Sequence, residues 1–256
     1  ENCAEAMIKK WGKRTSIALY GKRYYPLTDP QSCGNISANT ALMFAQLWQE
    51  PSSKFYHNKD IKDYAIAHFK ASAADQEAQG TGEINYTFLF PHPDGTYSAF
   101  HLSSWLLFEH FFRYEDGTPV LPSVRYNIEW AEPWELKYNV EPWVKYKSRY
   151  NHCGGTEQSK RAMAMYDMSK RGLVQLDDWQ DYYTNVKFTP ATNRQYDTSY
   201  PAYDPRGTSE PTEEEYFGHH WAWIRGLWNN IVMDVPEEWW LVSFNSWWKT
   251  NNSINR

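Results

Sequence analysis

The strongest structural signal in the chain is the stretch His101-Leu-Ser-Ser-Trp-Leu-Leu-Phe-Glu-His-Phe-Phe-Arg-Tyr114, which is long, apolar and free of glycine and proline. Such a segment is typical of a helix that packs into a core. The residues that follow, Glu115-Asp-Gly-Thr-Pro119, are turn formers and predict that the helix stops there. We therefore expect a helix over 101–114 that ends in a tight turn.

The spacing of apolar residues predicts further helices on both sides of this segment. Ile61, Tyr64 and His68 share one side of a helix at a spacing of three to four residues. Thr212 and Glu215 form a capping box, which is typical of a helix start. Helices are expected over 3–20, 39–50, 59–74, 156–172 and 212–233. The predicted fold class is therefore mainly α.

Glycine and proline predict long irregular connections between these helices. Residues 75–100 are punctuated by both residue types, and three prolines among many aromatic residues favour irregular structure over 121–150. Four prolines lie in 189–211, and a loop of that length in a compact domain is usually functional. We expect a helical bundle core joined by long loops rich in aromatic and proline residues.

Size and composition bound the fold and the partners. The chain of 256 residues is expected to form one domain, with N-terminal helices over 1–58, a core over 59–233 and a tryptophan-rich tail over 234–256. Aromatic residues make up 18% of the chain, so rings must supply much of the buried apolar surface. The net charge of −5 argues against nucleic acid as a partner. Every apolar run is far shorter than the ~20 residues of a membrane span.

Cysteines and glycosylation sequons favour a secreted protein. Three cysteines occur, at Cys3, Cys33 and Cys153, and they show no spacing typical of a zinc site. Sequons start at Asn35, Asn85 and Asn251, and the first residue is Glu rather than Met. We expect a processed, extracellular glycoprotein with one disulfide between Cys3 and Cys33. The paired tryptophans at 239–240 and 247–248 are predicted to form an exposed patch.

Several of the eight histidines lie where a helical bundle would build a metal site. His68 is in the middle of a predicted helix on its apolar side, His92 is in a tight loop, and His101 begins the apolar helix. His219 and His220 lie inside the capped helix. Imidazoles that point inward from several helices form metal sites in bundle cores, and nitrogen ligands suit copper, zinc or iron. The alternative for each histidine is an ordinary packed or surface residue.

Three segments resemble the copper motifs of tyrosinases, catechol oxidases and molluscan-type haemocyanins. The segment from His92 to Glu109 is similar to the first copper motif, in which two histidines nine residues apart precede an aromatic-rich helix. Residues 64–68 resemble the segment that supplies the first ligand, and 216–228 resemble the second copper motif. The resemblance implies a tyrosinase-like bundle that holds copper through His68, His92, His101 and His220, or His219 in a shifted register.

The sequence departs from that family at the second copper. The family takes two further ligands from the motif H-N-x-x-H, and the corresponding stretch here is Thr192-Asn-Arg-Gln-Tyr196. A threonine hydroxyl is a poor ligand because it stays protonated at neutral pH, whereas a phenolate binds copper when the metal lowers its pKa. We therefore expect one strong copper site rather than a normal pair. The alternative for this stretch is a polar loop that never approaches the metal.

Together these features predict a copper-dependent oxidoreductase that oxidises phenolic or other aromatic substrates with O2 or peroxide. Glu109 and Asn193 would orient the ligands or line the entrance, and Tyr196 would lie near the metal. One alternative is a non-catalytic protein of the same fold that binds glycans or aromatic ligands. Another is an accessory subunit of a larger assembly. The substrate and the oligomeric state are left open.

Overall fold

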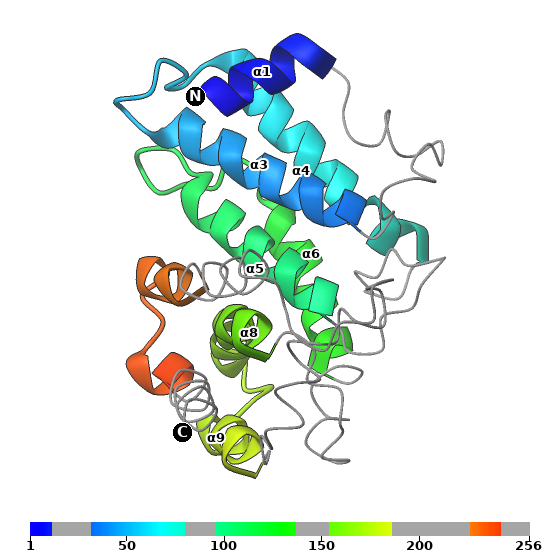
Figure 1. Cartoon of the computed structure of the whole chain (residues 1–256), viewed down its shortest axis with the longest axis vertical. Helices are drawn as coiled ribbons and strands as arrows, with labels where there is room; N and C mark the ends of the chain where they lie inside the picture. The colour runs from blue at the N-terminus through cyan, green and yellow to red at the C-terminus, as the bar shows by residue number, and fades with distance from the viewer. Residues whose placement is uncertain (12–31, 80–95, 137–153, 186–225, 242–256) are drawn as a thin grey trace, which may run out of the picture. The chain divides into compact units, whose positions relative to one another are not determined.

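The computed structural model describes residues 1–11, 32–79, 96–136, 154–185 and 226–241, and these are mainly helical (Figure 1), as predicted. The named helices are α1 Asn2–Trp11, α3 Ser32–Gln49, α4 Lys59–Gln79, α5 Thr96–Phe111, α6 Ser123–Glu135, α8 Gly154–Ser169 and α9 Leu176–Asn185. Residues 226–232 and 237–241 are also helical. Within these ranges, β pairing is limited to a bridge between Arg113 and Pro119.

The contacts divide the chain into two compact units. The first comprises residues 1–92 and 100–134, and the second comprises 93–99 and 135–256. The first unit thus joins the predicted N-terminal helices over 1–58 to the beginning of the predicted core. The single domain over 1–256, with its boundaries at 58 and 233, stays a prediction.

The first unit is built around a helical hairpin. α3 and α4 run side by side (Figure 1) and are joined by residues 50–58. Phe44 on α3 stacks on Tyr64 on α4 with ring centroids 5.4 Å apart. Large rings dominate the buried interior, as the composition predicts. The largest fully buried side chains of the first unit are Trp105, Phe44, Phe69, Phe108, Phe112, Ile61, Leu102, Leu106 and Ile128.

The tight turn after α5 confirms the prediction for residues 115–119. Gly117 adopts φ +82°, and its N–H donates to the carbonyl of Tyr114 at 2.9 Å. The N–H of Thr118 donates to the Asp116 carboxylate at 2.8 Å, which is the turn contact that Asp commonly makes. Positive φ is easily reached by glycine, so the position of Gly117 explains why the chain reverses there.

Two predicted loops contain helices. The loop predicted over 75–100 is wrong at both ends, because α4 continues to Gln79 and α5 begins at Thr96. The irregular structure predicted over 121–150 is wrong for 123–135, which forms α6. Pro122 precedes the first residue of α6, where a missing N–H costs little, and Pro133 lies in its last turn. Proline at these two places therefore leaves most of the helix intact.

The second unit contains α8, α9 and the short helices that follow. α8 ends in a Schellman motif, in which Leu173 N–H donates to Met168 O at 3.1 Å and Gly172 N–H donates to Ser169 O at 3.0 Å. Gly172 has φ +73°, which confirms the predicted helix end. The indole N–H of the buried Trp179 on α9 donates to the carbonyl of Trp239 at 2.8 Å. Trp239 is itself only 5% exposed, so the prediction of an exposed patch is wrong for this residue.

Several further predictions concern residues outside the described ranges. The capping box at Thr212, the loop over 189–211 and the tryptophans at 247–248 are among them. Cys3 on α1 is exposed and free, and the side chain of Cys33 is outside the described residues, so the predicted disulfide stays a prediction. None of the helices described in the structure is long and apolar enough to cross a membrane.

Candidate metal centre

His68 lies in the middle of α4 and points into the first unit. Its side chain is buried, and its ring centroid lies 5.7 Å from that of Phe44 on α3. The spacing of Ile61, Tyr64 and His68 predicted this inward position correctly. Burial lowers the pKa of His68 to about 4, because a charged imidazole loses its hydration there. The imidazole is therefore neutral at neutral pH, which is the form that binds metals.

The Nδ1 atom of His68 has no hydrogen-bond partner in the part of the chain that the structure describes. Two other buried polar residues follow on α4 at intervals of one turn, and both are hydrogen-bonded. Ser72 Oγ accepts from the indole of Trp105 at 2.8 Å and donates to the carbonyl of Phe69 at 2.6 Å. Gln76 Nε2 donates to the carbonyl of Asn127 at 2.9 Å. A buried nitrogen without a partner calls for an explanation, and a bound ligand would supply one.

The packing of α4 on α5 defines the level of His68 in the unit. The ring of Phe69 contacts both Phe108 and Trp105, at centroid distances of 5.0 and 5.5 Å, and Ser72 binds Trp105. Later residues of α4 thus meet earlier residues of α5, so the two helices are antiparallel. His68, directly before Phe69, lies near the level of Phe108.

Contacts of α3 support the same register. Trp48 contacts Phe112, the residue directly after α5, at 5.3 Å, and Phe44, one turn earlier on α3, contacts His68. Since α3 and α5 are both antiparallel to α4, the level of Phe44 corresponds to one turn before Phe112. The backbone of His101 therefore lies about two turns, roughly 11 Å, along α5 from the level of His68. The side chain of His101 lies outside the described residues, so its predicted role as a metal ligand stays a prediction.

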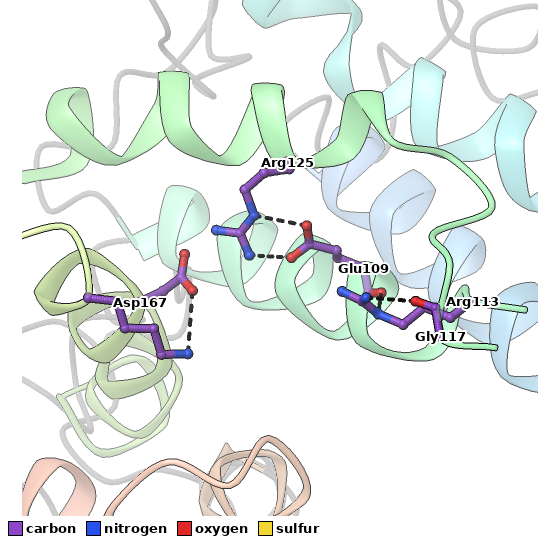
Figure 2. Close-up of polar contacts among 6 residues, drawn as sticks. Glu109, Arg113, Gly117, Arg125 and Asp167 are labelled. Atoms are coloured by element: carbon purple, nitrogen blue, oxygen red, sulfur yellow. Dashed lines mark hydrogen bonds and ion pairs between the residues drawn. The ribbon is translucent and has the colours of Figure 1, made fainter. Parts of the chain in front are cut away.

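Glu109 lies at the level of His68 but interacts with α6 (Figure 2). Its carboxylate binds the guanidinium of Arg125 through two parallel hydrogen bonds, one of them 2.8 Å long from Nε. The carbonyl of Glu109 accepts a further bond from Arg113 at 3.0 Å. A bidentate pair of this kind fixes the orientation of two helices. The role predicted for Glu109 beside the metal stays a prediction, and its observed contacts are those of an α5–α6 clamp.

The other predicted site residues are not described by the structure. His92, His220, Asn193 and Tyr196 lie outside the described ranges, and the side chain of His101 is not described either. Among the described residues, no three His, Cys, Asp or Glu side chains gather into a group able to hold a metal ion. His68 alone therefore represents the predicted site here, as a single neutral nitrogen ligand. A complete copper site needs ligands from beyond these ranges.

Sequence reasoning did not find two polar arrangements in the first unit. One is the partnership of Glu109 with Arg125, because nothing in the spacing of residues on different helices indicates which charges meet. The other is a stack of rings around His57, whose ring centroid lies 4.5 Å from that of Trp48. The positive φ of His57, at 50°, has no sequence signal comparable to a glycine.

Comparison of the chain with protein-family models, with curated proteins and with solved structures finds no match.

Proposed function

We propose that the chain is a copper-binding oxidoreductase that acts on phenolic or other aromatic substrates with O2 or peroxide. The observation that carries this proposal is the buried, neutral imidazole of His68, whose Nδ1 lacks a partner among the described residues. A nitrogen ligand of this kind suits copper, which would supply the one-electron redox chemistry when bound. The aromatic residues around it would exclude water and favour aromatic substrates.

The proposed ligand set is the one that the sequence predicts. His68 would be the anchoring ligand, and His92, His101 and His220 would supply further nitrogens. We propose one strong copper site per chain rather than a pair. Secretion, glycosylation and the Cys3–Cys33 disulfide are proposed with it, on the sequence features alone.

Copper titration of the metal-free protein tests this proposal. Wild-type protein should bind one Cu(II) per chain with an electron paramagnetic resonance spectrum typical of nitrogen ligands. His68→Leu should abolish tight binding, whereas His110→Gln, which alters an exposed histidine on α5, should leave it unchanged. Two tightly bound coppers per chain, or unchanged binding in His68→Leu, would contradict the proposal.

A second candidate function is metal-independent binding of glycans or aromatic ligands. Tyr126 on α6 is 64% exposed, and its ring centroid lies 5.8 Å from that of Trp130, one turn later. The exposed carboxylate of Glu129 lies on the same helix between them in sequence. Aromatic faces with a polar neighbour are suited to sugar rings, which present both CH and OH groups. Metal-free protein that binds glycans, and loses this binding with Tyr126→Ala, would favour this function.

A further inference from the structure

A column of stacked rings runs outward from the buried Trp48. The imidazole of His57 lies 4.5 Å from the ring of Trp48 and 4.1 Å from that of Tyr56, with interplanar angles of 26° and 16°. Two rings that are nearly parallel to a third and this close to it must cover its opposite faces. Trp48, His57 and Tyr56 therefore form a continuous stack, here called the ring column. Stacked π systems in contact are a short path for an electron.

The backbone holds the middle of the ring column in a strained conformation. His57 adopts φ 50°, which L-residues other than glycine rarely do, and its N–H donates to the carbonyl of Trp48 at 2.9 Å. Strain of this kind persists only where surrounding contacts impose it, and it is often found at functional positions. In this conformation the ring of His57 lies between those of Trp48 and Tyr56.

The two ends of the ring column, Tyr56 and Trp48, differ in whether a proton acceptor lies beside them. Tyr56 donates its hydroxyl proton to Glu115 Oε1 at 2.6 Å, a short bond to a carboxylate. That bond raises the pKa of Tyr56, so the phenol keeps its proton and directs it at the carboxylate. Trp48 Nε1 is buried without a hydrogen-bond partner in the described ranges. Oxidised Trp48 would therefore remain a cation, whereas Tyr56 loses its electron and proton together.

The ring column also approaches the candidate metal centre. Phe44 contacts the ring of His68 at 5.7 Å and lies one helical turn before Trp48 on α3. Side chains one turn apart lie on the same side of a helix, so Phe44 and Trp48 lie on the same side of α3. The ring column therefore begins one turn along α3 from the residue that contacts His68.

We propose that Tyr56 is a redox-active tyrosine that oxidises external phenols, with the ring column as its electron path and Glu115 as its proton acceptor. This inference rests on the proposed function in one respect: the copper chemistry supplies the peroxide-derived one-electron oxidant. Trp48 gives one electron to that oxidant and takes one from Tyr56, whose proton passes to Glu115. A phenol then gives one electron to the Tyr56 radical, the proton returns from Glu115, and the phenol releases its own proton to water.

Radical labelling with biotin-tyramide, itself a phenol, tests this proposal on the metal-free protein. A photogenerated ruthenium(III) tris-bipyridine complex serves as the one-electron oxidant. A tyramide radical formed at a tyrosine couples to a tyrosyl radical there, each partner having lost one electron and one proton, and peptide mapping measures this label on each tyrosine. Tyr126 is the matched control, because it is 64% exposed and lies outside the ring column. Tyr56 should carry at least about threefold more label than Tyr126, since the hydroxyl of Tyr56 is hydrogen-bonded to a carboxylate that can take its proton.

Two variants separate the electron path from the proton acceptor. Glu115→Gln changes an exposed side chain, can still accept the hydrogen bond from Tyr56, and cannot take its proton. We expect it to lower the label on Tyr56 at least about threefold and to leave Tyr126 unchanged. Trp48→Phe should do the same, with circular dichroism to confirm folding. The proposal would be overturned if the amount of label on each tyrosine simply increased with its solvent exposure. It would also be overturned if the label on Tyr56 were unchanged in both variants.

A second arm uses copper-loaded protein with hydrogen peroxide and the same probe. Label on Tyr56 in this arm as well would support both proposals. Label with the ruthenium oxidant but none with copper and peroxide would leave the ring column supported and would contradict the proposed copper chemistry. The two failures are therefore distinguishable.

Discussion

Acidification should destabilise the metal-free protein through His68. The imidazole is buried beside Phe44, so the folded chain resists its protonation, whereas the unfolded chain accepts the proton freely. Between the unfolded pKa and the folded pKa, only the unfolded state holds this proton. The free energy of unfolding therefore falls as the pH decreases through that window and falls no further below it.

The size of the effect follows from the two pKa values of His68. Its pKa is about 4 in the folded chain against an ordinary value of 6.5, so the window runs from about pH 6.5 to about pH 4. A pKa difference of one corresponds to about 1.4 kcal/mol, so the complete loss is about 3 kcal/mol. Between about pH 7 and pH 4.5, we expect His68 to remove about 2.5 kcal/mol of stability.

Urea denaturation in the presence of EDTA measures this loss, with tryptophan fluorescence as the probe. Carboxylates also titrate in this range, so the informative quantity is the difference between wild type and His68→Leu at each pH. The variant should lose about 2.5 kcal/mol less than wild type on acidification to about pH 4.5. His110→Gln, at an exposed position, should behave as wild type. A difference between wild type and His68→Leu that is the same at both pH values would refute the reasoning.

Three further substitutions test the packing. In Gly172→Ala the added methyl group meets no atom within 4 Å, but the residue must keep φ +73°, so the free energy of unfolding should fall by about 1 kcal/mol. Asp234→Gly relieves a φ of 51° and should raise the melting temperature. Gln76→Leu and Asn127→Leu should each lower the free energy of unfolding, measured in urea, by about 1–3 kcal/mol, because each leaves a buried amide without its partner. If the two residues are paired, the effects of the two substitutions should not add in the double variant. Trp105→Phe removes an indole N–H that is bonded to α4 and should cost about 2 kcal/mol, measured by thermal melting.

Local signals in the sequence predicted the helical class and two of the helix ends, whereas α6 was missed. The turn at Gly117 and the helix end at Gly172 were predictable because positive φ strongly favours glycine at such places. α6 was not predictable from its prolines, since Pro122 precedes the first turn and Pro133, although inside the helix, lies in the last turn and removes a hydrogen bond only near its end. The sequence alone does not show where the helix begins relative to these prolines.

The candidate site was predictable only in part. The inward position of His68 follows from its spacing with Ile61 and Tyr64, which is a property of one helix. The level of His101 relative to His68 depends on how α4 packs against α5, through the contacts of Phe69 with two rings of α5. Such a register is set by the fit of side chains between helices, and no periodicity within either helix encodes it.

The polar stripe on α4 gives the strongest reason to look for a ligand at His68. His68, Ser72 and Gln76 follow one another at intervals of one turn, and all three are buried. A polar side chain in a core destabilises a protein unless it is hydrogen-bonded, and Ser72 and Gln76 receive their partners from the neighbouring helices. Leucine would fill the same space without the cost of an unpaired nitrogen, so packing alone does not explain a histidine at this position. His68→Leu should therefore stabilise the metal-free protein at neutral pH. Copper should reverse the order of stability, because it binds and stabilises only the wild type.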